Sequence, residues 1–254
     1  NLANRDLIYL GVSGDGDSAS IGFGQFAHAI RRGVNMVYIV ENNGVYGLTK
    51  GQFSATADKG SKSKRGISNM DEPLDMIGMA MSLGATYVGR SFSGDKTQLV
   101  PLIKGAIEHQ GAAFIDVISP CVAFNNHAGS TKSYEYVRQH NEAVNRLDII
   151  ESRDEITADY APGEVVNITQ HDGSIVRLRK LAADYDPTNR IQVMNYLQQR
   201  AAAGEVVTGL LYIDPQAVDL HQNLNIVETP LNQLGTRELC PGTVALERIN
   251  ASLR

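Results

Sequence analysis

Two short motifs carry the side chains best suited to chemistry, Gly14-Asp15-Gly16 and Glu41-Asn42-Asn43-Gly44. Asp15 offers an anionic oxygen and Asn43 an amide oxygen, and Mg²⁺ prefers oxygen ligands that it shares with phosphate groups. The backbone carbonyl of Val45, just beyond the second motif, would be a third protein ligand. Glycines on both sides of the aspartate let backbone N–H groups approach an anion closely. Together the motifs predict a site for Mg²⁺ and a diphosphate.

A strand-helix-strand unit would place both motifs on one edge of a sheet. The apolar run 7–12 predicts a buried strand, residues 18–32 have helical spacing, and 36–40 predict a second buried strand. Strands joined in this way are parallel, and their carboxyl ends form the usual ligand crevice of α/β sheets. Taken separately, Gly-Asp-Gly is usually a turn and Asn-Asn-Gly a loop. Their connection through such a unit favours a binding site.

The two motifs resemble the thiamine diphosphate signature. The longer run Glu41-Asn42-Asn43-Gly44-Val45-Tyr46-Gly47-Leu48-Thr49-Lys50-Gly51-Gln52 resembles the β subunits of 2-oxoacid:ferredoxin oxidoreductases, most closely the 2-oxoglutarate branch. The resemblance extends through Ser119-Pro120-Cys121 to the C-terminal region. It implies coenzyme A-dependent oxidative decarboxylation of a 2-oxoacid, or the reverse carboxylation, with ferredoxin as electron acceptor. It also implies an α2β2-type heteromer whose α subunit supplies the activating glutamate, so we assign no catalytic residue within this chain.

The resemblance also implies roles for individual residues. The cofactor-binding set is Gly14, Asp15, Gly16, Asp17, Asn43, Val45, Gly47, Leu48 and Thr49. Lys50 would attract the substrate carboxylates as a point charge, and Leu48 would form a wall of the substrate pocket. Without the resemblance, a single loop lysine is more often a solvated surface group.

Cys121 matches a ligand of the four-iron four-sulfur cluster in the resembled family, and thiolates are the usual ligands of such clusters. On its own, a solitary cysteine after a buried strand is most often an inert core residue. The other cluster ligands of the family lie upstream of the position matched by Asn1. We therefore expect the sequence to be a fragment or a processed portion of the β subunit. Cys240 has no counterpart and is expected to be structural.

The composition agrees with an enzyme component of the cytoplasm. The 254 residues, 43% hydrophobic and 20% charged, suit one large α/β domain or one domain with an extension. A net charge of −5 and a pI near 5.7 give no general attraction to nucleic acid or anionic membranes. No apolar stretch approaches the roughly 20 residues that span a bilayer, and no secretory signal is present. Two cysteines do not make a disulfide framework.

Strands and helices continue to alternate after the motifs. Helices are expected at 73–83 and 98–109, and strands at 85–88 and 113–118. This alternation predicts a thiamine diphosphate-binding α/β domain over 1–147, with a mostly parallel sheet and helices on both faces. Residues 148–254 are expected to form a C-terminal α+β extension that covers the site or contacts a partner. Its expected elements are a β-hairpin over 165–178 turning at Asp172-Gly173, helices at 189–203 and 243–253, and a strand at 208–213.

Several interpretations stay open at this point. The loop 44–69 contains a basic run that could face an acidic ferredoxin or be a solvated surface: Lys59, Lys62, Lys64 and Arg65. His127 could act as an acid or base, although a loop histidine without a partner is more often exposed. The alternatives to the oxidoreductase are another thiamine diphosphate-dependent decarboxylase or synthase, which usually carries both cofactor domains on one longer chain, and a noncatalytic cofactor-binding subunit.

Overall fold

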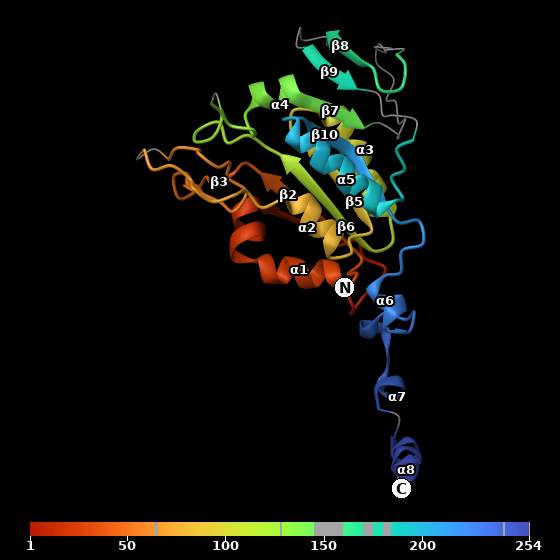
Figure 1. Cartoon of the computed structure of the whole chain (residues 1–254). Coiled ribbons are helices and arrows are strands. Elements are labelled where there is room, and N and C mark those ends of the chain that lie inside the picture. The colour runs from red at the N-terminus through yellow and green to blue at the C-terminus, as the bar shows by residue number, and fades with distance from the viewer. Residues whose placement is uncertain are drawn as a thin grey trace.

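A six-stranded sheet forms the centre of the molecule (Figure 1). The computed structural model describes residues 1–63, 66–127, 129–144, 160–169, 175–179, 184–240 and 242–253. The strands follow the order β1 (Leu10–Gly14), β2 (Met36–Asn42), β6 (Ala112–Ile118), β5 (Tyr87–Phe92), β10 (Val206–Ile213) and β7 (Asn141–Val144). The first four are mutually parallel, and β10 runs antiparallel to β5 and parallel to β7. The predicted, mostly parallel sheet is confirmed.

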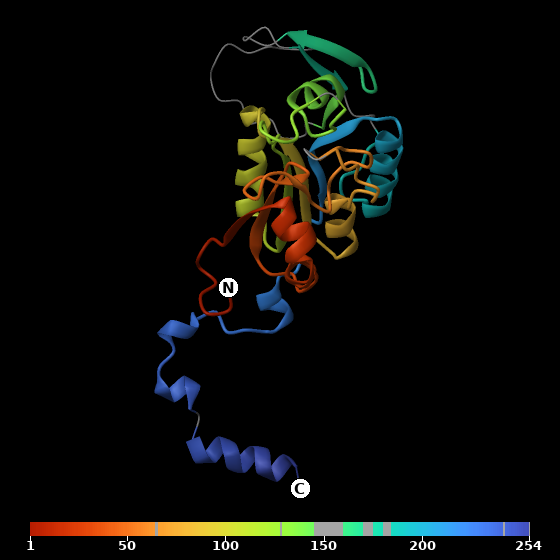
Figure 2. The same ribbon diagram turned by 90° about the vertical axis from the view of Figure 1, so that its left-hand side faces the viewer.

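Helices cover both faces of the sheet, as predicted. Figure 2 shows α1 (Phe23–Arg31), α2 (Met76–Ser82) and α5 (Arg190–Ala202) on one face and α3 (Lys96–Glu108) on the other. The alternation of side chains along each strand feeds two cores. On β6, Phe114 packs toward α1, where its ring meets that of Phe26 edge-on at a centroid distance of 5.2 Å, whereas Ile115 packs toward α3. Each buried aromatic or aliphatic side chain contributes about 1.5–3 kcal/mol.

The first strand differs from the sequence prediction. It begins at Leu10 and not at Leu7, and it lies at the end of the strand order, where it pairs with β2. Leu10 and Val12 are 53% and 56% exposed, so the expectation of a buried strand over 7–12 is wrong for this chain. An apolar run specifies a strand more reliably than it specifies what covers that strand, because an edge strand has a neighbour on one side only.

The connection from β1 to α1 is a π-helical turn, η1 (Gly16–Ile21), and not the first turns of a continuous α-helix from 18 to 32. Asp15 stands directly before this turn. After β2, the chain makes the short hairpin β3 (Val45–Tyr46) and β4 (Gln52–Phe53). Both departures from regular α/β geometry lie at the carboxyl ends of β1 and β2, where the two polar motifs meet.

The region beyond residue 147 contributes to the central sheet through β10, which lies between β5 and β7. The predicted hairpin strands pair as β8 (Val165–Thr169) and β9 (Ile175–Arg179), and their turn, including Asp172-Gly173, lies outside the described residues. Another helix, α4 (Tyr134–His140), precedes β7. The division into domains 1–147 and 148–254 stays a prediction, and β10 shows that the two parts share one sheet.

The C-terminal arm, residues 220–253, leaves the sheet at the amino ends of its parallel strands, the amino edge (Figures 1 and 2). Its elements are α6 (Leu220–Asn223), the 3₁₀ turn η2 (Leu231–Gln233), α7 (Thr236–Leu239) and α8 (Gly242–Ser252). The arm is tied to the body near its start, where Leu220 N–H donates to Gly33 O at 2.8 Å and Leu231 N–H donates to Ala3 O at 2.8 Å. Across the described part of the chain, no helix is both long and apolar enough to cross a membrane.

Candidate functional site

Asp15 is the centre of the polar cluster at the carboxyl edge, and it is only 1% exposed. Its Oδ2 accepts hydrogen bonds from Gly44 N–H at 3.0 Å, from the Thr56 hydroxyl at 2.5 Å and from the Ser54 hydroxyl. A buried carboxylate is costly unless it is paired or hydrogen-bonded. The three donors therefore fix Asp15 and compensate much of its lost hydration.

The second oxygen of Asp15 is less occupied. Within the described residues, Oδ1 accepts one hydrogen bond, from Asn43 N–H at 3.4 Å, which is long for this type of bond. Asn43 Oδ1 in turn accepts the N–H of Val45 at 3.0 Å. The fold thus brings together the three residues predicted to bind Mg²⁺, and it leaves lone pairs on both side-chain oxygens. Among the described residues, no three His, Cys, Asp or Glu side chains cluster so that they could hold a metal ion. The predicted Mg²⁺ ligands are one carboxylate, one amide and one backbone carbonyl, so they need no such cluster.

The β3–β4 hairpin packs directly onto Gly16. The Tyr46 hydroxyl donates to Gly16 O at 3.0 Å, and a Cβ at residue 16 would stand 2.4 Å from the Tyr46 ring. Gly44 is restricted in the same way, with φ of +77° and 2.8 Å between an added Cβ and Asn125 Nδ2. Glycine is therefore required at both positions by the close approach of neighbouring groups.

A second loop closes over the motif loop. Asn125 is buried and donates its Nδ2 to Asn43 O at 2.7 Å. Lys132 is also buried and pairs with Asp58 at 3.1 Å, and Asp58 additionally accepts the Thr131 hydroxyl at 2.6 Å. These bonds join the segments around Asn125 and Lys132 to loop 44–58 and frame Asp15.

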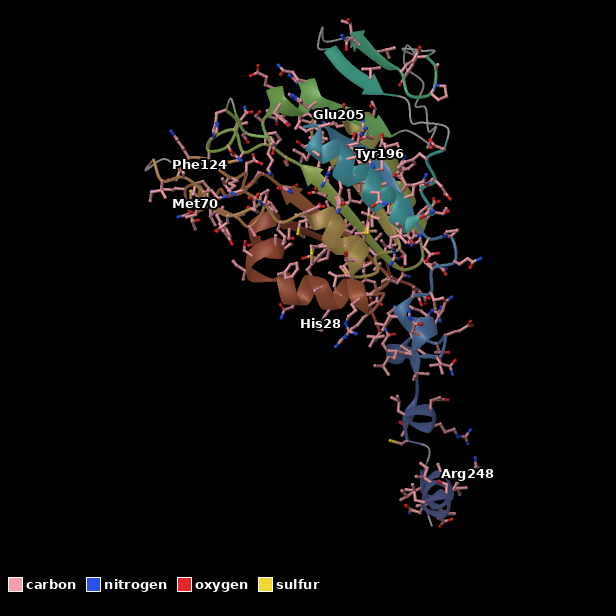
Figure 3. The ribbon with its side chains drawn as sticks, in the orientation of Figure 1. His28, Met70, Phe124, Tyr196, Glu205 and Arg248 are labelled. Atoms are coloured by element: carbon pink, nitrogen blue, oxygen red, sulfur yellow. The ribbon has the colours of Figure 1, made fainter. Side chains whose placement is uncertain are left out.

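The electrostatics of this frame extend to α4. Burial, and secondarily the Asp58 carboxylate, raise the pKa of Tyr136, whose hydroxyl donates to Gly204 O at 3.0 Å. A small hollow lies between the two loops, lined in part by Val45, Lys62 and Phe124. Figure 3 shows Phe124 at the carboxyl edge, near Met70 from the segment before α2, and far from Arg248 on α8. The arrangement offers a fixed carboxylate beside an open, polar-lined surface.

The remaining predicted cofactor and substrate residues lie at the hairpin turn, 47–51. Thr49 Oγ1 bonds Gln52 Oε1 at 2.5 Å, and Asp17 is exposed just beyond Gly16. Leu48 is 99% exposed, and Lys50 is exposed with a φ of +82°, a left-handed conformation that costs energy for a residue with a side chain. The loop thus projects an apolar and a cationic side chain outward. Their assignment to a substrate pocket stays a prediction.

Both cysteines are described and both are free. Cys121 is half-buried, and its Sγ lies 3.7 Å from the place of an added Cβ on Gly47, so it faces the hairpin turn. Its role as a cluster ligand stays a prediction. Cys240 is exposed at the end of α7, so a structural role in a core does not apply to it in this chain.

The structure bears on part of the basic run and on the exposure of His127. Lys59 forms an ion pair with Glu72, and both side chains are more than half exposed, as expected for a solvated surface. Lys64 and Arg65, from the same basic run, lie outside the described residues. His127 is exposed, in the loop beyond Cys121. Its catalytic use stays a hypothesis.

Sequence reasoning missed the side chains that support Asp15. Ser54 and Thr56 lie in a loop without periodicity, and Asp116 lies within an apolar strand. Asn125 lies in the loop that also carries His127. For Asp116, a signal was present, because a charged residue inside the run Ala113–Ile118 must find a buried partner.

Known proteins match this chain most clearly over its first half. Residues 1–117 match the family model of the thiamine pyrophosphate enzyme, C-terminal TPP binding domain. The β subunit of 2-oxoacid:ferredoxin oxidoreductase from a Sulfolobus species is 46% identical over 126 residues, which are 49% of this chain and 41% of that protein. The 2-oxoglutarate synthase subunit KorB of Methanocaldococcus jannaschii is 32% identical over 172 residues, 66% of this chain and 63% of that one.

A solved structure extends the similarity to nearly the whole chain. The 2-oxoglutarate:ferredoxin oxidoreductase from Magnetococcus marinus, with 2-oxoglutarate, coenzyme A and succinyl-CoA bound, superposes with a TM-score of 0.64 at 27% identity. The match covers 96% of this chain and 68% of that one. The 2-oxoglutarate oxidoreductase subunit KorB of Mycobacterium tuberculosis is 38% identical over 49% of this chain and 34% of its own length. This chain thus spans less than half of the Sulfolobus and Mycobacterium relatives.

Proposed function

Because the chain is similar to β subunits of 2-oxoacid:ferredoxin oxidoreductases, we propose that it is the β component of such an enzyme and that its carboxyl edge binds thiamine diphosphate through Mg²⁺. The observation that carries the proposal is the buried Asp15 carboxylate, whose Oδ1 faces Asn43 within the segment that matches the TPP binding domain. We place the cofactor domain in 1–147 and the extension in 148–254.

The donor set fits the metal. Asp15 Oδ1, Asn43 Oδ1 and the carbonyl of Val45 would hold Mg²⁺, and phosphate oxygens and water would complete its octahedral shell. Gly16 and Gly44, neither of which can accept a Cβ, support a close approach of the backbone to the diphosphate. When bound, thiamine diphosphate supplies carbanion stabilisation, and this chain supplies its placement and the electrostatic environment.

The proposed substrate is 2-oxoglutarate. The named M. jannaschii and M. marinus proteins act on or contain it, and the latter structure also holds coenzyme A. In the forward direction CO₂ leaves, the acyl group passes to coenzyme A, and two electrons leave for an acceptor, which we propose is ferredoxin. Lys50 would orient a substrate carboxylate by charge, and Leu48 would line the apolar part of the pocket.

The chain would work only with a partner. An α subunit would complete the pocket and supply the group that activates the cofactor, in an α2β2-type assembly. Cys121 would be one thiolate ligand of a four-iron four-sulfur cluster. The exposure of Leu48 supports a pocket that this chain does not close alone.

The decisive experiment is 2-oxoglutarate-dependent reduction of a low-potential acceptor by the full-length protein, coexpressed with its α-type subunit. We expect activity that requires coenzyme A, Mg²⁺ and thiamine diphosphate together. Release of CO₂ from 2-oxoglutarate without coenzyme A and without reduction of the acceptor would instead indicate a nonoxidative decarboxylase. A complex that binds the cofactor but turns over no 2-oxoacid would support the noncatalytic alternative.

A further inference from the structure

A chain of hydrogen-bonded side chains runs behind Asp15 into the middle of the sheet. Thr56 Oγ1 lies 2.5 Å from Asp15 Oδ2 and 3.0 Å from Asn42 Oδ1. Asn42 Nδ2 donates to Asp116 Oδ1 at 3.1 Å, and Arg90 Nε donates to Asp116 Oδ2 at 2.9 Å. The chain therefore connects the carboxyl edge with the partly exposed Arg90 without an interruption.

The sheet register dictates this connection. Asp116 stands on β6, directly opposite Arg90 on β5 and Val40 on β2. Asn42 is two residues beyond Val40, so it projects from the same face of the sheet and reaches Asp116 diagonally. Asp116, on the strand between β2 and β5, thus accepts hydrogen bonds from a side chain on each of these two strands.

Asp116 is a costly residue for this place. It is 1% exposed in the middle of the sheet, and the Arg90 side chain that neutralises it is 20% exposed. A buried ion pair is seldom more stabilising than well-packed apolar side chains of similar volume, because both charges lose their hydration. Stability alone therefore gives a weak reason for a carboxylate here, which directs attention to what Asp116 holds in place.

We propose that Asp116 is a positioning residue for the metal-binding end of β2. By accepting from Asn42 Nδ2, it turns Asn42 Oδ1 toward Thr56, whose single hydroxyl hydrogen is then shared between Asn42 and Asp15. Asn43 follows Asn42 directly. Through Thr56, the orientation of the Asn42 side chain thus bears on Asp15, a proposed ligand of Mg²⁺, so this inference rests on the proposed function.

The backbone around Asn42 is secured independently of Asp116. Ser119 N–H donates to Asn42 O at 2.9 Å, and Asn125 Nδ2 donates to Asn43 O at 2.7 Å. Loss of the carboxylate should consequently release the Asn42 side chain without melting the end of β2. The effect is expected mainly on the metal site.

The test is Asp116→Asn in the full-length protein with its α-type subunit. Mg²⁺-dependent affinity for thiamine diphosphate, measured by titration calorimetry, should fall about 10-fold or more, as is common for groups that orient metal ligands. Asp219→Asn is the matched control, because Asp219 is also a buried carboxylate but caps α6 at the opposite edge. Asp219→Asn should keep the unsubstituted affinity for thiamine diphosphate, even if its unfolding temperature falls as far as that of Asp116→Asn.

A second readout separates positioning from general destabilisation. With Mn²⁺ in place of Mg²⁺, Asp116→Asn should change the electron paramagnetic resonance line shape of the bound metal, and Asp219→Asn should not. Asn42→Ala should weaken affinity to a similar extent, and the double variant should lose little more, because the two residues act in one chain. Asn42→Ala also serves if Asp116→Asn does not fold.

Unchanged affinity and line shape in Asp116→Asn, or in a folded Asn42→Ala, would overturn the inference while leaving the proposed function intact. Fully additive losses in the double variant would overturn it as well. If the unsubstituted protein binds neither metal nor thiamine diphosphate, the proposed function itself fails.

Discussion

The carboxyl edge of the sheet buries polar side chains, whereas the C-terminal arm exposes apolar ones. At the carboxyl edge, polar side chains such as Asp15, Asn42 and Thr56 are buried and hydrogen-bonded. Along α8, the large apolar side chains of Val244, Leu246 and Ile249 are 69%, 56% and 57% exposed. The hydrogen bonds of the polar cluster form within one chain, whereas no leucine, isoleucine or valine side chain among the described residues of the arm is fully buried. Folding free energy and chemistry therefore concentrate in the body of the molecule.

The same substitution in the two regions gives the largest expected contrast. Ile115→Ala removes a side chain that is 0% exposed between β6 and α3, and it should lower the free energy of unfolding by about 2–5 kcal/mol. Ile249→Ala removes one that is 57% exposed on an 11-residue helix, which is marginal in isolation, so the change should stay within about 0.5 kcal/mol. Urea unfolding of the isolated chain measures both. An equal loss at the two positions would contradict the comparison.

Asp15→Ala tests the edge as a binding site. The variant should lose at least about 100-fold in Mg²⁺-dependent affinity for thiamine diphosphate, which is about 2.7 kcal/mol. It also leaves the Gly44 N–H and two hydroxyls without their acceptor, so some loss of stability should accompany it. Calorimetric titration and circular dichroism separate the two effects. Asp71→Ala, at an exposed position before α2, is the control, and wild-type affinity in Asp15→Ala would remove the site assignment.

The sequence predicted the positions of helices and strands better than their burial and pairing. Apolar periodicity located β2, β6, α3 and α5 within a few residues, because each buries a regular face. The same signal could not show that β1 would lie exposed at an edge, since burial depends on neighbours that are distant in sequence. The pairing of β10 with β5 and β7 was hidden for the same reason.

The site was predictable to a similar, limited depth. Residues in a recognisable local motif, Asp15 and Asn43, were found, and the fold places them together. Their supports, Ser54, Thr56 and Asp116, come from a loop and a strand that carry no motif. Only the register of the sheet and the path of the loop bring such residues to the aspartate. Neither the sheet register nor the loop path can be predicted from the local sequence.

Lys50→Ala sharpens the comparison at the exposed rim of the edge. In the reconstituted enzyme, the KM for 2-oxoglutarate should rise about 10-fold, since a charge contact to a carboxylate is worth roughly 1.5–3 kcal/mol when formed. Affinity for thiamine diphosphate should change much less, because Lys50 lies in the exposed hairpin turn. Lys59→Ala is the matched control, as Lys59 is exposed and pairs with Glu72. Equal KM values for the two variants would exclude Lys50 from the substrate pocket.

The smallest effect is expected at the amino edge, where His109 lies against Thr86, with 2.8 Å between Nε2 and Oγ1. Burial lowers the pKa of His109, and the Asp214 carboxylate partly offsets that shift. In the unfolded chain a histidine has a pKa of about 6.5, so below that pH the unfolded state binds the proton more readily. The stability contributed by neutral His109 is therefore complete above about pH 6.5 and is lost as the pH falls through the lower, folded pKa.

His109→Gln keeps a side-chain amide near Thr86 but cannot titrate. Its unfolding free energy should fall less steeply than that of the unsubstituted chain between about pH 7 and about pH 5, by less than about 1 kcal/mol, because the ring is partly open to solvent. Urea unfolding at several pH values measures this difference. Cofactor affinity at pH 7 should be unchanged, since the ring lies at the opposite end of the strands from Asp15. A loss of affinity in His109→Gln would mean that the two edges are coupled through the sheet, and their separation into a chemical and a structural edge would no longer hold.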